Sequence, residues 1–290
     1  MSDRPGSLRF GFVQWELADR LGPPPGRYVV RRFAGDEARH VVVISAVTAP
    51  RRLQRARRRA RAAVPARGPQ PVDVTRATVV DAVPLGEAPA AAAWLERAAG
   101  ADAPATVRAA LAVLNQAVQG HRVATADPYV AEVGPARPLV TRVGYGSGAQ
   151  TGEGRWEVAR ELPRPGRRPG VIAGVEAQDR LAALLAGRDV ALACEELALR
   201  ARLDLDHGRQ REAALQTRIA LDAALAELEG WRDVPGIAAH IEELQRHRAA
   251  VEAAARTALQ GGLQPAEAAA IEPALSRLEE AIRNRAASPR

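Results

Sequence analysis

Lysine is absent from this sequence of 290 residues, and all 41 basic side chains are arginines. A Walker A phosphate loop, a Schiff-base enzyme and a protein kinase each depend on a specific lysine. The sequence therefore excludes these three enzyme classes. Arginine stays charged at every relevant pH and can donate two parallel hydrogen bonds to a phosphate or a carboxylate. The positions of the arginines therefore indicate where an anion would bind.

Cysteine, aromatic residues and long apolar runs are also scarce. Cys194 is the only cysteine, which excludes an intramolecular disulfide and a cysteine-based zinc cluster and is typical of a reducing compartment. Aromatic residues make up 3% of the chain, so the core must be built from Val, Leu, Ile and Ala. No run approaches the roughly 18 apolar residues that cross a bilayer, and the first residues do not resemble a signal peptide. We predict a cytoplasmic protein with no membrane partner.

Charge is distributed unevenly along the chain. Residues 1–72 contain 15 arginines and 5 acidic residues, a net charge of +10, whereas residues 73–170 carry +1 and residues 171–290 carry −4. A Pro/Gly-rich stretch follows the densest arginine run, and this composition cannot form a core, so we predict that 51–71 is an exposed segment. The arginines of that run are Arg51, Arg52, Arg55, Arg57, Arg58, Arg59 and Arg61.

The first half of the chain has the pattern of an α+β domain over 1–162. Short β-branched runs alternate with turn residues, and two alanine-rich stretches favour helices. The first three runs are close in sequence and predict a meander. The expected strands are 10–17, 27–33, 41–47, 72–80, 139–143 and 155–162, and the expected helices are 87–99 and 104–120. We therefore predict a mixed β-sheet with two helices.

The second half predicts an antiparallel α-helical bundle over 174–290. Residues 163–173 are rich in proline and glycine and form the expected linker. Beyond them, apolar residues recur in steps of four and three, which makes a narrow stripe that must be buried against another helix. The stripes are Ile237, Ile241 and Leu244, then Val251, Ala255 and Ala258, and in the last helix Ile271, Leu275, Leu278 and Ile282. Packing within the chain is favoured over dimerisation because neighbouring helices are available.

Arg248 interrupts the first of these stripes at a position where an apolar side chain is expected. Its helix must therefore turn the guanidinium outward or bring it to a carboxylate. We keep self-association through the C-terminal helices as an alternative, which would make the protein a homo-oligomer.

The glycine-rich segment 144–154 is the best candidate for a ligand loop. Closely spaced glycines let backbone N–H groups approach a phosphate, but the spacing differs from the dinucleotide fingerprint GxGxxG and a strand follows instead of a helix. A hairpin connection is therefore favoured. If the segment does bind a ligand, the residues involved are Arg142, Gly144, Tyr145, Gly146, Ser147, Gly148 and Arg155.

No other catalytic or metal-binding pattern is present. The five histidines are scattered, and none has the HExxH spacing that puts two imidazoles on one helical face. Ser147 lacks the strand-to-helix elbow of a serine hydrolase. We therefore predict no catalytic residue, no metal site and no cofactor, although a carboxylate pair assembled by folding would leave no local mark.

These observations favour a non-catalytic interaction or scaffold protein. Its arginine run would contact an anionic partner, either nucleic acid or an acidic protein surface, because each phosphate that is neutralised releases counterions. Its helical bundle would mediate protein–protein contacts. The alternatives are an enzyme or ligand-binding domain with a pocket near 144–154, and a self-assembling structural subunit.

Overall fold

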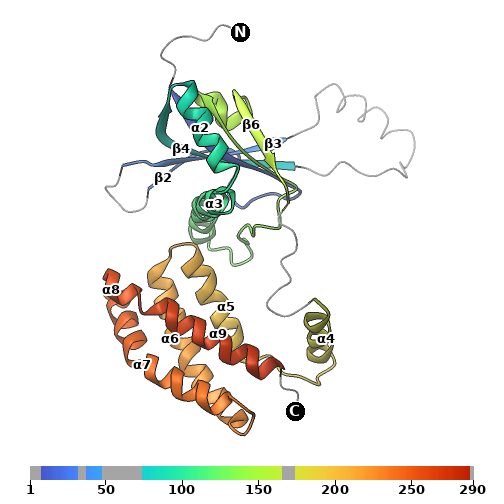
Figure 1. Cartoon of the computed structure of the whole chain (residues 1–290), viewed down its shortest axis with the longest axis vertical. Coiled ribbons are helices and arrows are strands. Elements are labelled where there is room, and N and C mark those ends of the chain that lie inside the picture. The colour runs from blue at the N-terminus through green and yellow to red at the C-terminus, as the bar shows by residue number, and fades with distance from the viewer. Residues whose placement is uncertain (1–7, 32–36, 48–73, 165–173, 288–290) are drawn as a thin grey trace, which may run out of the picture. The chain divides into compact units, whose positions relative to one another are not determined.

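The computed structural model describes residues 8–31, 37–47, 74–164 and 174–287, with side chains described from 177 in the last range (Figure 1). The chain divides into two compact units, Met1–Arg167 and Arg168–Arg290. The first contains a β-sheet with helices and the second is helical. The α+β class with a C-terminal helical bundle is therefore confirmed. Most of the predicted linker, and all of 51–71, lies outside the described residues.

The sheet of the first unit has six strands in the order β2-β3-β4-β1-β5-β6. All of its pairings are antiparallel, whereas the sequence suggested a mixed sheet. The strands are β1 (Arg9–Leu17), β2 (Gly26–Val30), β3 (His40–Val47), β4 (Val74–Gly86), β5 (Val140–Ser147) and β6 (Val158–Leu162).

The meander predicted for the first three strands is wrong in one respect. Strands β2, β3 and β4 follow one another, but β1 lies between β4 and β5 and does not pair with β2. The physical reason is that β1 is buried on both faces over most of its length, including Phe12 and Trp15. A strand that is covered on both faces belongs in the middle of a sheet.

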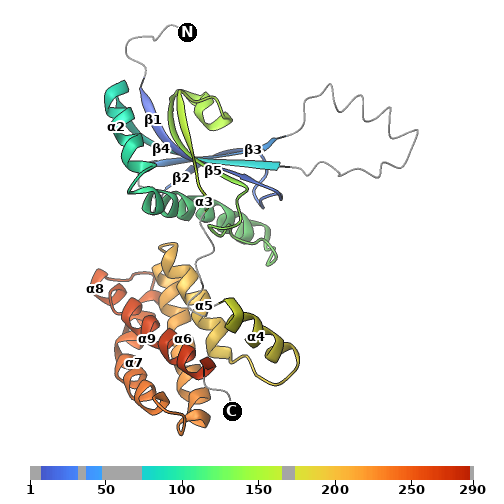
Figure 2. The ribbon, with the colours of Figure 1, turned by 45° about the vertical axis from the view of Figure 1, so that its right-hand side comes forward.

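Two helices cover one face of this sheet, α2 (Ala88–Ala98) and α3 (Ala103–Thr125) (Figure 2). Trp15 of β1, Leu95 of α2 and Leu114 of α3 meet in the core between the layers. The layers approach closely because β1 has no side chain at Gly11. A Cβ atom there would lie 2.7 Å from the Trp94 ring.

The second unit is built on four long helices. Helix α6 packs against α5 and α7, and α9 packs against α5, α6 and α7, so the four enclose one core. The bounds are α4 (Gly174–Leu185), α5 (Ala193–Asp206), α6 (Gln210–Glu227), α7 (Ile237–Leu259), α8 (Pro265–Ala268) and α9 (Ile271–Ala287), with a 3-10 turn η2 at Leu228–Trp231.

Most residues of the apolar stripes predicted from the four-three spacing lie in this core, whereas Ala258 and Ile271 lie in a second, smaller cluster. Ile241 and Leu244 of α7 and Leu275 and Leu278 of α9 are buried together within the chain. Arg248 leaves the stripe as expected, because its side chain turns to the surface and its Nε lies 3.2 Å from Asp222 Oδ1.

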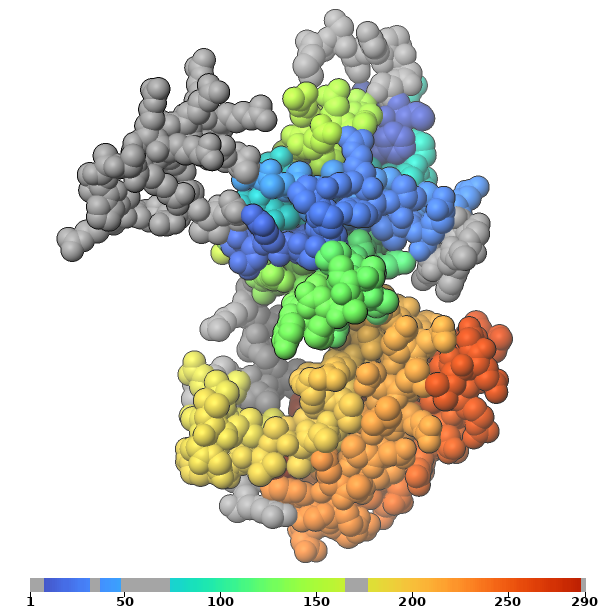
Figure 3. Space-filling view, turned by 180° about the vertical axis from the view of Figure 1, so that it is seen from behind, coloured from blue at the N-terminus to red at the C-terminus, as the bar shows by residue number. Residues whose placement is uncertain are grey.

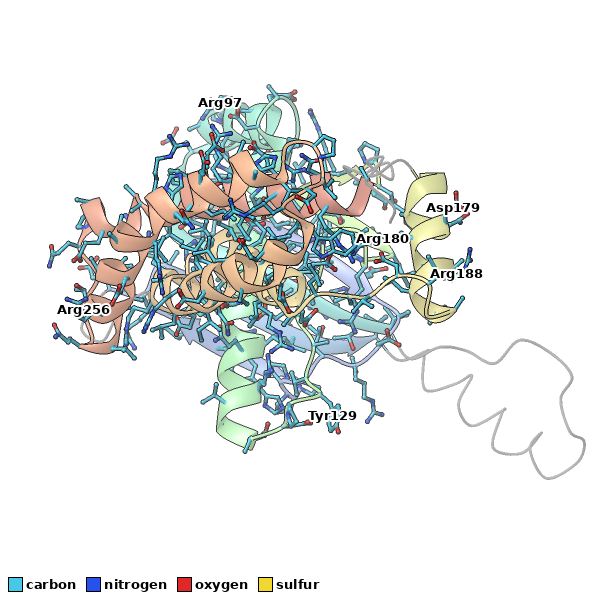
Figure 4. The ribbon with its side chains drawn as sticks, turned by 90° about the horizontal axis from the view of Figure 1, so that it is seen from below. Arg97, Tyr129, Asp179, Arg180, Arg188 and Arg256 are labelled. Atoms are coloured by element: carbon cyan, nitrogen blue, oxygen red, sulfur yellow. The ribbon has the colours of Figure 1, made fainter. Side chains whose placement is uncertain are left out.

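Helix α4 stands apart from these four helices (Figure 1). Among its described residues, Arg180 holds α4 to the segment that follows it. Arg180 Nη2 donates to Glu195 Oε1 at 2.7 Å, and its Nε donates to Asp189 Oδ2 at 3.3 Å. Arg180 turns toward the bundle, whereas Asp179 points away from it (Figure 4). An ion pair therefore attaches a helix that contributes little to the apolar core.

Candidate functional site

The arginine run itself lies outside the described residues, but both of its attachment points are described. Strand β3 ends at Val47, strand β4 begins at Val74, and these two residues are direct partners in the β3–β4 ladder. The 26 residues between them, which include 51–61, therefore connect two residues that lie opposite each other in one rung of the sheet. They form an insertion between two inner strands of the first unit.

A row of charged side chains crosses the sheet beside this attachment point. Glu16 of β1 accepts a hydrogen bond from Arg142 Nη1 at 2.8 Å, and its Oε1 lies 3.5 Å from Arg76 Nη2. Arg142 Nη2 also donates to Glu161 Oε2 of β6 at 3.3 Å. The row contains two arginines and two glutamates, so its charges compensate one another within the sheet.

The glycine-rich segment 144–154 is not an open loop. Its first four residues belong to β5, and a short 3-10 helix, η1 (Ala149–Glu153), then folds back over the sheet face that lies opposite α2 and α3. A Cβ atom on Gly146 would lie 2.7 Å from Thr151 Oγ1, and one on Gly152 would lie 2.5 Å from Val43 Cγ2. These glycines permit close packing, which is a sufficient reason for their presence.

Three side chains of the sheet hold η1 in place. Arg27 Nη2 donates to Glu153 Oε1 at 2.6 Å and to the carbonyl oxygen of Ala149 at 3.2 Å. Arg76 Nη1 donates to the carbonyl oxygen of Glu153, and Thr78 Oγ1 donates to that of Gly152, each at 3.2 Å. The segment is therefore bound to strands β2 and β4 through both its backbone and a side chain.

The residues predicted to bind a ligand do not converge. Tyr145 is buried in the core on the helix-covered face, whereas Arg142 lies in the charged row on the opposite face. Ser147 ends β5, Gly148 has a φ of 70° that suits glycine, and Arg155 is exposed. The ligand loop stays a prediction, and the geometry brings together only part of its residue set.

A polar pair that the sequence analysis did not single out lies beneath η1. Gln14 is fully buried, and its Nε2 donates to Thr78 Oγ1 at 2.8 Å. Within the described part of the chain, no protein group bonds to Gln14 Oε1 or to Thr151 Oγ1. The available signal was Gln14 between Val13 and Trp15, because an amide that is buried among apolar residues needs hydrogen-bond partners.

In the second unit, charged side chains are buried where α9 meets the start of α5. Only 2% of the Arg285 side chain is exposed, and its Nη2 lies 2.8 Å from Asp189 Oδ1. Its Nη1 lies 3.7 Å from Glu195 Oε1. Burial of Asp189 opposes ionisation, but hydrogen bonds from the Val190 N–H and the two arginines outweigh it, so the pKa of Asp189 lies below its usual value. This cluster is a structural ion-pair network.

Glu227 caps the N-terminus of α5 from the end of α6. Its two carboxylate oxygens accept hydrogen bonds from the backbone N–H groups of Ala193 at 2.9 Å and Cys194 at 3.0 Å. Burial raises the pKa of the Cys194 thiol far above its usual range, and the nearby Glu227 carboxylate raises it further. A thiol that does not ionise is a poor nucleophile, and Cys194 is fully buried in the core of the bundle.

The surface of the bundle carries exposed apolar side chains. Leu199 and Leu203 of α5 are 68% and 44% exposed, and their spacing of four places them on one face of the helix. Leu181 and Leu185 repeat this spacing on α4, with 55% and 81% exposed. Exposed leucines at helical spacing are candidates for contact with another protein.

Other kinds of site find little support. Among the described residues, no group of three His, Cys, Asp or Glu side chains is placed to hold a metal ion. None of the described helices combines the length and apolar character needed to cross a bilayer. A scan of protein-family models, a search of curated proteins and a search of solved structures each returned no match.

Proposed function

We propose that this chain is a non-catalytic interaction protein whose arginine insertion binds an anionic partner and whose helical bundle contacts another protein. The observation that carries the proposal is the placement of seven arginines in an insertion whose two ends are held at the Val47–Val74 rung. The strands of this rung are inner strands of a six-stranded sheet, so both ends of the insertion are attached to paired strands.

The chemistry of the insertion suits a chain of phosphates or carboxylates. Arginine binds either group bidentately, and each phosphate that it neutralises releases condensed counterions. The arginines and glutamates of the charged row beside the attachment point pair with one another, so the row itself adds no excess charge of either sign. No base-reading element accompanies the run in the sequence, so we expect binding without sequence preference. Nucleic acid or an acidic protein surface would serve as the partner.

The second unit supports the other half of the proposal. Residues 171–290 carry a net charge of −4. Leu199 and Leu203 are exposed on one face of α5. In the stripe that would favour self-assembly, Ile271, Leu275 and Leu278 are buried inside the bundle, and Ile282 is partly buried against its core. A contact with a different protein therefore has better support than assembly through that stripe. The ligand-pocket alternative is weaker, because Arg142 is paired and the glycines are used in packing.

The proposal is tested by binding of full-length protein to fluorescent duplex DNA and to poly-glutamate over a salt series. Replacing all seven arginines with Gln should abolish retention of both polyanions. A graded test replaces four arginines of the run with Gln. The expected change is a decrease of about 3 to 4 in the slope of log affinity against log salt for the duplex, since each phosphate contact contributes about 0.9. The four positions are Arg55, Arg57, Arg58 and Arg59.

The matched control removes the same charge from the bundle. It replaces Arg200, Arg218, Arg246 and Arg256, whose side chains are exposed. We expect this control to retain most of the wild-type affinity and slope. Equal losses in the two variants would show that net charge, and not the insertion, determines binding. Poly-glutamate binding without duplex binding would identify the partner as an acidic protein.

A further inference from the structure

Strand β2 forms one edge of the sheet and has a free side. It pairs with β3, and within the described residues no strand pairs with its other side. In an antiparallel ladder, alternate residues direct their N–H and C=O groups away from the neighbouring strand. The outer side of β2 therefore presents backbone donors and acceptors to a further strand. The opposite edge strand, β6, differs because Arg160 and Glu161 on it are held in ion pairs with Glu96 and Arg142.

A groove of about 440 Å³ lies between β2 and the C-terminal half of α3. Tyr28 and Val30 of β2 line one wall, and Ala117, Gly120 and Ala124 of α3 line the other. The space exists because these three helix positions, at spacings of three and four on one face, carry almost no side chain. In Figure 3 this part of α3 (green) lies directly below the strands of the N-terminal region (blue).

The two faces of the sheet at β2 offer different side-chain contacts to an added strand. Residues of a strand alternate between the two faces of the sheet, so Tyr28 and Val30 face α3, whereas Val29 faces the other way. Val29 is 56% exposed at the centre of the edge strand. An extended segment laid along β2 would place alternate side chains in the groove and one intervening side chain against Val29. Three consecutive apolar residues therefore fit.

The charge at the end of the groove is positive. Arg31, which directly follows β2, lines the groove, and its carbonyl oxygen accepts a hydrogen bond from Gln116 Nε2 at 2.9 Å. Among the described residues, no carboxylate lines the groove and none pairs with the Arg31 guanidinium. An acidic residue at the corresponding end of an added strand would supply the missing partner.

Arg31, together with Arg27 of the edge strand, argues against a second copy of this chain as the occupant. If two β2 strands paired antiparallel about Val29, Arg27 of one copy would lie directly opposite Arg31 of the other. This clash would occur twice in the symmetric pair, and like charges opposite one another destabilise a ladder. An acidic segment would instead be attracted to β2, because its carboxylate would lie opposite a guanidinium.

We infer that the edge of β2 and the adjoining groove form a docking site for an extended peptide segment of a partner, with three apolar residues next to an acidic one. The segment adds a seventh strand to the sheet, so the backbone supplies affinity and the side chains supply specificity. This site is separate from the arginine insertion and does not depend on it.

The test measures binding of a labelled peptide containing Glu-Val-Ile-Val between Gly-Ser flanks to the full-length chain at about 0.15 M salt, where distant charges are screened. It is run on the wild type and on the variant with all seven arginines of 51–61 replaced by Gln, which removes attraction of the peptide by the insertion. Two further peptides serve as controls. One replaces the Glu of the peptide with Lys. The other carries backbone N-methyl groups on the peptide edge that would pair with β2, which removes those hydrogen bonds.

The groove is closed by Gly120→Leu. No atom lies within 4 Å of a Cβ built at Gly120, and leucine is a better helix former than glycine, so this variant is expected to fold. The matched control is Ala109→Leu on the exposed side of α3. We expect Gly120→Leu to weaken peptide binding at least about tenfold, because the leucine side chain occupies the groove. Arg31→Gln should weaken it about threefold, because an exposed charge pair contributes little in water.

The site would be supported by saturable binding that persists in the seven-Gln variant, is at least about tenfold weaker in Gly120→Leu and protects the β2 amides from hydrogen exchange. Binding that is equal in wild type and Gly120→Leu, or equal for the N-methylated peptide, would overturn it. So would the absence of saturable binding. Because the seven-Gln variant affects only the arginine insertion, failure of the groove site and failure of the proposed polyanion binding are distinguished.

Discussion

The guanidinium carbon of Arg285 lies 4.3 Å from the centroid of the Trp231 ring. This contact joins the last turns of α9 to η2, and the same guanidinium is paired with Asp189 in the segment before α5. Three parts of the second unit that are distant in sequence therefore meet at one buried cation. We therefore expect their attachment to depend on this cation more than on an exposed ion pair.

Removing the cation should destabilise the bundle strongly. Arg285→Ala leaves Asp189 without its closest cation and is expected to lower the free energy of unfolding by about 3 kcal/mol, as for other partly dismantled buried pairs. Urea unfolding followed by far-UV circular dichroism measures the change. Arg246→Ala removes an arginine that is 72% exposed, so its expected effect is below about 0.5 kcal/mol. Similar losses in both variants would contradict the role assigned to the buried cluster.

The cap on α5 makes stability depend on pH. Burial raises the pKa of Glu227, but hydrogen bonds from the backbone N–H groups of Cys194 and Ala193 lower it more, so the folded pKa lies below the ordinary value of 4.5. The ionised carboxylate therefore stabilises the fold above that value, and its contribution is lost as the pH falls through the folded pKa.

Glu227→Gln should remove this contribution. We expect a loss of about 1 kcal/mol at neutral pH, typical of a helix cap, and a shallower fall in stability below pH 4.5 than in the wild type. Unfolding midpoints measured across acidic pH give both quantities. Glu242→Gln, on the exposed side of α7, is the control and should follow the wild-type curve. An unchanged acid profile in Glu227→Gln would show that the cap is energetically silent.

The close approach of β5 and β6 depends on glycine. A Cβ atom on Gly144 would meet the carbonyl oxygen of Val158 and would lie 2.7 Å from the Phe12 ring. Gly144→Ala is therefore expected to lower the stability of the first unit by about 2 kcal/mol, as overpacked cores do. Thermal unfolding measures this loss of stability. Gly134→Ala is the control, because a Cβ atom there meets nothing within 4 Å. A tolerated alanine at Gly144 would mean that the two strands separate easily.

Cys194 should be unreactive in the native protein. Burial, followed by the adjacent Glu227, raises the pKa of its thiol, and the side chain is inaccessible. A maleimide at neutral pH is expected to label it only after unfolding, whereas Ala253→Cys on the exposed side of α7 should react readily. Mass spectrometry at increasing urea concentration measures both. Rapid native labelling at Cys194 would indicate that the N-terminus of α5 opens frequently.

Much of the second unit could be predicted from the sequence because its signals are local. The four-three spacing in α7 and α9 identified side chains that are now found in one core. The position of Arg248 was also readable, since a charge in an apolar stripe must reach the surface. The attachment of α4 was not, because Arg180 acts through Asp189 and Glu195, which follow only after the helix has ended.

The first unit was harder to predict because strand order is not local. The segments that became strands were largely identified, yet nothing in FGFVQWEL shows that β1 pairs with β4 and β5. The groove beside β2 was also missed. Ala117, Gly120 and Ala124 look like ordinary helix residues until β2 is placed across from them. A concave site made by two distant segments leaves no pattern in either one.

The pairing of Val47 with Val74 also bears on how this protein can change over time. An insertion whose two ends share one rung imposes no particular length on the sheet, because the entropy of closing a loop grows only logarithmically with its size. Doubling or halving the inserted stretch would cost or gain only about 0.6 kcal/mol. The length and composition of residues 48–73 can therefore change, in evolution or by design, while strands β3 and β4 keep their pairing.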